Sequence, residues 1–221
     1  MKVYHYSHLS NWQNIQRGSW KSDNKPGLGA YRRIGQDDME ACNTKAVFAL
    51  LEPLPDNWIN NEHFKGVWDY FRYDIGTLLL EIEIDPEKDQ IFMADRGHVE
   101  GVLYYEDKEG IPEKYLHPSR REGERSYMES KIPLKDYLEK AKDLRYSMPE
   151  VIITEDVPLE KIRISEQQPL IEDELRKCGE KFRQMLIRDI QSVPELSQWY
   201  KQREHDKELQ EGKRGFGEKL K

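Results

Sequence analysis

The sequence predicts an α+β protein in which small, largely antiparallel sheets are followed by a helical C-terminal part. β-type runs alternate with turns and short helical segments up to residue 165, and few helices between them are long enough for a parallel crossover. From Gln168 onward the pattern is helical and highly charged. We therefore expect an α+β domain over residues 1–165 and a charged amphipathic helical extension over residues 166–221.

Several segments of the first part have the composition of strands. The first is residues 3–7. The next are residues 45–51 (KAVFALL) and 77–84 (TLLLEIEI), and residues 90–94 continue the strand that 77–84 begins. The last two are residues 151–154 and 162–164, which lie on either side of a turn. A helix is expected over residues 62–73, with Phe64, Trp68 and Phe71 on one side.

The C-terminal part shows a helical apolar period. Apolar residues recur at steps of three and four from Ile171 to Ile190, which predicts one amphipathic helix packed on the preceding domain or on a partner protein. Pro194 is expected to interrupt it, a short helix to follow over residues 196–200, and residues 211–221 to fray.

Composition excludes several classes of protein. The 35 basic and 42 acidic residues give a net charge of −7, all of it in residues 1–165, which disfavours broad electrostatic binding of nucleic acid but permits a local basic channel. Cys42 and Cys178 are far apart, as expected of two reduced thiols. No apolar run approaches the roughly 20 residues of a membrane span, so we expect a cytoplasmic protein. His5 and His8 lack a clustered set of further ligands, so no metal is expected.

The N-terminal segment has the pattern of a ligand cradle. In a strand over residues 3–7, His5 and Ser7 share one face, while Tyr4 and Tyr6 share the other. A capping residue, Ser10 or Asn11, precedes a short helix that ends at Gly18. The alternative is a core histidine that is satisfied by one backbone partner.

A second informative segment spans residues 148–162. The run 151–153 is apolar on both faces, so Glu150 stands at the mouth of a buried strand. A carboxylate in that position is either capped or functional.

Both segments resemble the ADP-ribosyltransferase superfamily. Residues 148–162 resemble its last catalytic strand, with an acidic residue at the strand start, aliphatic residues, a Val-Pro turn and a final strand. The N-terminal segment is similar to the first strand of DarT-like nucleic-acid ADP-ribosyltransferases. The matching residues are His5, Ser7, Asn11, Ile15 and Gly18. Residues 45–51 and 76–84 resemble the strands that flank the nicotinamide-stacking tyrosine in the poly(ADP-ribose) polymerase branch.

The resemblance implies a split β-sandwich of two small sheets over residues 3–164 and an enzyme that uses NAD as co-substrate. His5 would contact the ligand, helped by neighbouring residues Tyr6, Ser7 and Asn11, and Tyr70 or Tyr73 would stack on nicotinamide. Glu150, kept ionised, would stabilise the oxocarbenium-like transition state and help deprotonate the acceptor.

Two arginines stand where DarT-like proteins carry an arginine used on phosphate and acceptor. Arg32 and Arg33 follow the loop GLGAY, and a guanidinium binds phosphate oxygens bidentately. Two solvated arginines are the alternative. Residues 45–53 fit the DarT-like pattern poorly, which leaves the acceptor open among DNA, RNA and protein.

Three other segments leave alternatives open. Glu81 and Glu83 resemble paired catalytic glutamates only superficially, so we expect solvated strand positions. Residues 95–100 either reach the cleft or form a turn and a helix start. Residues 120–131 form either a basic acceptor loop or a surface helix with ordinary charge pairs.

Three functions fit this pattern. The first is a mono-ADP-ribosyltransferase acting on nucleic acid or protein with release of nicotinamide. The second is an enzyme that resembles tRNA 2′-phosphotransferases and also uses NAD. The third is a non-catalytic interaction module that binds a partner protein through the C-terminal helices.

Overall fold

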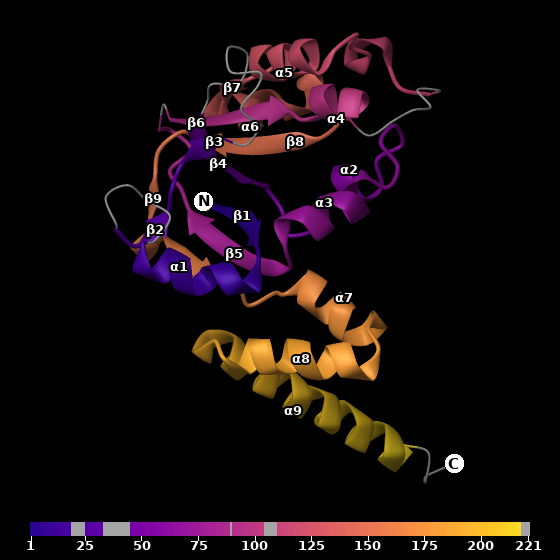
Figure 1. Cartoon of the computed structure of the whole chain (residues 1–221). Coiled ribbons are helices and arrows are strands. Elements are labelled where there is room, and N and C mark those ends of the chain that lie inside the picture. Colours follow the sequence, from indigo (N-terminus) through magenta and orange to yellow (C-terminus); the bar gives the residue numbers. More distant parts are fainter. Residues whose placement is uncertain (19–24, 33–44, 89, 104–109, 218–221) are drawn as a thin grey trace. The chain divides into compact units, whose positions relative to one another are not determined.

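The computed structural model describes residues 1–18, 25–32, 45–88, 90–103 and 110–217 (Figure 1). It confirms an α+β protein with small antiparallel sheets and a helical C-terminal part. The chain forms two compact units, Met1–Pro169 and Leu170–Lys221, whereas the sequence placed the boundary after residue 165. Among the described residues, no helix is long and apolar enough to cross a membrane.

The smaller main sheet contains the N-terminal strand. Its order is β1-β5-β10, with β1 (Lys2–Ser7), β5 (Leu78–Glu83) and β10 (Ile162–Ile164) all antiparallel. β5 is the central strand, and its first three residues are leucines that are fully buried. His5 lies opposite Leu80 in this register.

The larger sheet has the order β3-β4-β8-β6-β7. It contains β3 (Tyr31–Arg32), β4 (Lys45–Ala49), β8 (Pro149–Ile153), β6 (Ile91–Asp95) and β7 (Ile132–Pro133), again antiparallel. A two-stranded ribbon pairs β2 (Gly27–Leu28) with β9 (Val157–Pro158). An isolated bridge between Tyr4 and Leu50 joins β1 to the residue after β4, which brings the two main sheets together.

Helices complete the first unit. They are α1 (Trp12–Arg17), α2 (Asp56–Ile59), α3 (Val67–Ile75), α4 (Gly97–Leu103), α5 (Arg120–Glu129) and α6 (Leu134–Leu144), with short 3-10 turns η1 (Leu9–Asn11), η2 (Glu113–Tyr115) and η3 (Leu159–Lys161). Gly18 ends α1 in the left-handed conformation, with φ 73°, as the sequence predicted. Asn11 precedes α1, but its side chain does not cap the helix.

One hydrophobic cluster joins α4 and α5 to the larger sheet. Val99 of α4 and Tyr127 of α5 pack with Ala46, Ala94 and Ile152 of the central strands. The register places Phe48 opposite Ile152 and Ala94 opposite Glu150, so these side chains share one face of the sheet. The face that carries Glu150 is therefore the face that α4 and α5 cover.

The second unit departs from the predicted helices. The expected single helix over 171–190 is two helices, α7 (Pro169–Lys177) and α8 (Glu180–Gln191), because Gly179 lies extended at the N-cap of α8. Pro194 begins the 24-residue helix α9 (Pro194–Gly217) rather than interrupting a helix, since the first turn needs no N–H from it. Arg203 of α9 forms an ion pair with Glu172 of α7.

Glu81 corrects a sequence-based expectation. We expected a solvated position, but its side chain is buried and contacts Lys2 Nζ at 2.8 Å, Arg163 Nη2 at 2.6 Å and Ser165 Oγ at 3.0 Å. Glu83 is exposed, as expected. Cys178 is half-buried and forms no disulfide, and Cys42 lies outside the described residues.

Candidate functional site

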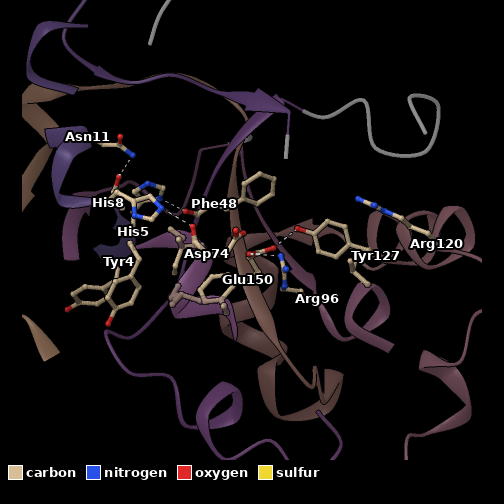
Figure 2. A pocket seen from close by; sticks show the side chains of 17 residues that line it. Tyr4, His5, His8, Asn11, Phe48, Asp74, Arg96, Arg120, Tyr127 and Glu150 are labelled. Atoms are coloured by element: carbon tan, nitrogen blue, oxygen red, sulfur yellow. Dashed lines mark hydrogen bonds and ion pairs between the residues drawn. The ribbon is translucent and has the colours of Figure 1, made fainter. Parts of the chain in front are cut away.

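A pocket of about 350 Å³ opens where the two main sheets meet (Figure 2). It is lined from the small sheet by β1, from the large sheet by β4 and β8, and otherwise by the ends of α3, α4 and α5. Five predicted site residues line it: His5, Tyr6, Ser7, Asn11 and Glu150. The fold thus brings together two segments that are more than half the chain apart.

Strand alternation aims Glu150 into this pocket. Glu150 shares its face of β8 with Ile152, which packs against α4 and α5, while Val151 and Ile153 face the other way. The side chain of Glu150 is 1% exposed. It therefore needs partners to be stable when ionised.

Those partners come from α5 and from the turn that precedes α4. Tyr127 Oη donates a hydrogen bond to Glu150 Oε2 at 2.8 Å, and Arg96 Nη1 lies 3.8 Å from Oε1. Figure 2 shows the three side chains directed toward one another. Burial raises the pKa of Glu150 to about 7, and Arg96 and Tyr127 oppose that rise only in part. The expectation of a fully ionised carboxylate is thus corrected to one that titrates near neutrality.

A second buried carboxylate shares the same arginine. Glu100 is fully buried, pairs with Arg96 Nε, and its Oε2 has no hydrogen-bond partner among the described residues. Burial raises the pKa of Glu100, and the nearby charge of Glu150 raises it further, against the lowering effect of Arg96. Because Glu100 and Glu150 share the single positive charge of Arg96, the pair favours a state in which one of the two carboxylates keeps its proton.

Aromatic rings hold the guanidinium from its other side. Arg96 Cζ lies 5.4 Å from the ring centre of Phe71 and 5.8 Å from that of Trp58. Phe71 also lines the pocket. The guanidinium of Arg96 is therefore held between the carboxylates and the rings, close to Glu150.

His5 is neutral and has a defined tautomer. Its Nδ1 lies 2.7 Å from the carbonyl oxygen of Phe48, and because a carbonyl only accepts, Nδ1 carries the hydrogen. Burial lowers the pKa of His5, which favours the neutral ring. Nε2 therefore presents a lone pair and can accept a hydrogen bond. His5 combines both predicted alternatives, since it has a backbone partner and also lines the pocket.

Further hydrogen bonds order the wall around β1. Asn11 Nδ2 donates to Ser7 Oγ at 3.3 Å. Asn11 does not cap α1, since its backbone is helical, with φ −79° and ψ −18°, whereas a capping residue is extended. His8 Nε2 donates to the carbonyl of Asp74 at the end of α3, at 3.0 Å. The polar wall is therefore tied to α3 as well as to β4.

Several predicted residues are not brought into the pocket as binding groups. Tyr70 and Tyr73 are 51% and 86% exposed on α3 and do not line it; the α3 aromatic that does is Phe71. Tyr6 lines the pocket, but its hydroxyl donates to the carbonyl of Pro53 at 2.6 Å and so anchors the strand. The backbone of Arg32 pairs with Lys45 in β3, while Arg33 lies outside the described residues.

Sequence reasoning missed the partners of Glu150. Residues 95–100 form a turn and a helix start, yet Arg96 also reaches the pocket. Residues 120–131 form mainly a helix, α5, and carry Tyr127 inward. The available signal was spacing: Arg96–Glu100 and Arg120–Glu124 are both Arg-x-x-x-Glu pairs, which bond along one helix face.

Comparisons of the chain with protein-family models, with curated proteins and with solved structures gave no match. Among the described residues, no group of three or more His, Cys, Asp or Glu side chains is placed to hold a metal ion. The chemistry of the pocket itself is therefore the basis for assigning a function.

Proposed function

We propose that this protein is an NAD-dependent mono-ADP-ribosyltransferase that transfers ADP-ribose to a nucleic acid or protein acceptor and releases nicotinamide. The observation that carries the proposal is the shared pocket of His5 and Glu150, since these two residues stand at the superfamily's positions in sequence and line one cavity in space. The proposed fold is the split β-sandwich of that superfamily, with NAD bound where the two main sheets meet.

The chemistry divides between ribose and leaving group. The bond between ribose C1′ and the nicotinamide nitrogen breaks, its electron pair leaves with nicotinamide, and positive charge develops on the ribose. Ionised Glu150, hydrogen-bonded to a ribose hydroxyl, stabilises that charge at short range in a buried site. The acceptor nucleophile then bonds to C1′, and its proton passes to the Glu150 carboxylate.

The protonation state of Glu150 suits this role. A general base works best when its pKa lies near the operating pH, and that of Glu150 is raised to about 7. The active form is the carboxylate, which predominates above pH 7. His5 Nε2 serves as a hydrogen-bond acceptor for a ligand hydroxyl or amide, since its Nδ1 hydrogen is held by Phe48.

The test is incubation of labelled NAD with single-stranded DNA, RNA and cell extract. We expect acceptor-bound label and free nicotinamide from the unaltered protein. Glu150→Gln should keep the fold and most of the NAD affinity but lose transfer. Glu155→Gln is the matched control, because Glu155 is an exposed acid just beyond the same strand.

The product decides among the candidate functions. Label on the acceptor supports transfer, and the labelled pool identifies the acceptor. ADP-ribose 1″,2″-cyclic phosphate would instead indicate the 2′-phosphotransferase reaction. Full activity of Glu150→Gln, or no nicotinamide release with any acceptor, would contradict the proposal.

A further inference from the structure

Of the two arginines that line the pocket, Arg96 and Arg120, Arg120 is the one whose charge is less engaged by the protein. It lies in the first turn of α5, lines the pocket that contains Glu150, and its side chain is 43% exposed. Its Nε donates to Glu124 Oε1 at 2.8 Å. Within the described part of the chain, neither Nη group of Arg120 donates a hydrogen bond.

The contact with Glu124 fixes how that guanidinium is presented. The side chain of Glu124 is fully buried, so it forms a rigid anchor one helical turn away from Arg120. An arginine that is bound through Nε keeps both Nη groups for another ligand, in a fixed plane. In Figure 2 the Arg120 side chain extends from α5 toward the side of Tyr127 and Glu150.

Arg96 shows how a fully engaged arginine of the same pocket differs. It also pairs with a buried glutamate one turn on, but its guanidinium is enclosed by Glu150 and two aromatic rings and is almost wholly buried. Arg96 therefore acts on the carboxylate. Arg120 remains the described arginine of this pocket that is accessible to a ligand.

We propose that Arg120 binds the diphosphate of the dinucleotide through its two Nη groups. This inference rests on the proposed NAD-dependent function. A guanidinium matches two phosphate oxygens in a bidentate geometry and stays charged at every physiological pH. The diphosphate lies next to the nicotinamide ribose in NAD, so a ribose at Glu150 brings its phosphates toward the neighbouring wall of the same pocket, where Arg120 lies.

The experiment measures, by calorimetry, the affinity of the protein for ADP-ribose, for NAD and for nicotinamide riboside, which lacks the diphosphate. A short single-stranded oligodeoxynucleotide is measured in the same way. Arg120→Gln should weaken ADP-ribose and NAD binding about ten- to a hundredfold, as expected for a lost charge-assisted hydrogen bond, and leave nicotinamide riboside unchanged. Arg125→Gln is the control, because it removes the same charge from an exposed position of α5 outside the pocket.

A double variant separates binding from folding. Arg120→Gln removes the Arg120 guanidinium from the buried carboxylate of Glu124. If that variant unfolds, Arg120→Gln combined with Glu124→Gln makes both side chains neutral and serves in its place. ADP-ribose affinity that stays within about twofold in the folded variant would overturn the inference, as would an effect on the oligonucleotide alone, or no binding of ADP-ribose by the unaltered protein. Arg120-dependent binding of ADP-ribose without any transfer would sustain the inference and contradict the proposed function.

Discussion

At the scale of single residues, burial and hydrogen bonding act on Glu150 in opposite directions. Burial raises its pKa, while the Tyr127 hydroxyl stabilises the ionised form. Tyr127→Phe removes that donor and should raise the pKa of Glu150 further, by about one unit for a hydrogen bond to a charged group. We expect the acid limb of the pH–activity profile to move to higher pH by that amount.

The control for this prediction is another buried tyrosine. Tyr137 lies on α6, outside the pocket, so Tyr137→Phe should leave the limb in place. An unchanged limb in Tyr127→Phe would mean that Glu150 does not control the activity. An equal movement in both variants would indicate a general structural effect.

The raised pKa of Glu150 also predicts how stability depends on pH. Its unfolded-state value is 4.5 and its folded value is about 7, so the folded protein binds the extra proton between those values and loses stability as pH rises through them. The full penalty is about 3 kcal/mol and is absent below pH 4.5. Glu150→Gln should therefore gain stability relative to the unaltered protein as pH rises.

Urea unfolding at pH 5 and pH 8 measures this difference. We expect the free energy of unfolding of Glu150→Gln, relative to the unaltered protein, to be more favourable at pH 8 by up to about 3 kcal/mol. A relative stability that is equal at both pH values would show that Glu150 has an ordinary pKa.

At the scale of elements, Gly76 lies between α3 and β5 and closely approaches the end of β1. It has φ +91°, and a Cβ there would lie 2.4 Å from the backbone nitrogen of His8 and 2.5 Å from the backbone of Ser7. These neighbours are main chain and cannot turn aside. With ψ 178°, Gly76 also lies in a backbone region that is essentially restricted to glycine. Gly76→Ala should therefore destabilise the protein by more than the roughly 1–3 kcal/mol of backbone strain alone and displace the His8 side of the pocket wall.

Gly66 provides a comparison at a left-handed position that has no clash. It has φ +83° at the other end of α3, but a Cβ there meets nothing within 4 Å. Thermal unfolding of Gly66→Ala therefore measures backbone strain without a clash. Equal losses in the two variants would contradict the predicted close approach at Gly76.

The elements also show what the sequence was able to predict. The two-residue period of a strand placed His5 and Ser7 on one face of β1, and the apolar run after Glu150 placed that residue at the end of a buried strand. All three residues line the pocket. Arg96 and Tyr127 were missed as site residues because their function depends on how α4 and α5 pack on the sheet, which no local pattern encodes. Tyr70 and Tyr73 were misplaced because helix orientation, rather than chain order, selects Phe71 to face inward.

At the scale of the whole molecule, the pocket belongs to the first unit. Its lining residues run from Tyr4 to Glu150, all before Pro169. The helical unit Leu170–Lys221 contributes no described residue to it. We therefore expect residues 1–169 alone to retain ligand binding.

The position of the cut tests the boundary itself. Gln168 is fully buried; its Oε1 accepts from the backbone N–H of Leu79 at 3.0 Å, and its Nε2 donates to the carbonyl of Leu79 at 2.9 Å. Nε2 also donates to the carbonyl of Ser165 at 2.8 Å. Ending the chain at residue 165, the boundary expected from sequence, removes the acceptor of the Leu79 N–H, while the Leu79 carbonyl keeps the backbone N–H of Ser165 at 3.0 Å.

A buried polar group that loses its partner costs about 1–3 kcal/mol, so residues 1–165 should be less stable than residues 1–169 by about that amount. Gln168→Ala in the full chain should reproduce most of the loss, because only the side chain makes these bonds. Equal urea midpoints for the two truncated chains would contradict this account. A difference that Gln168→Ala does not reproduce would assign the boundary to backbone contacts of residues 166–169 instead.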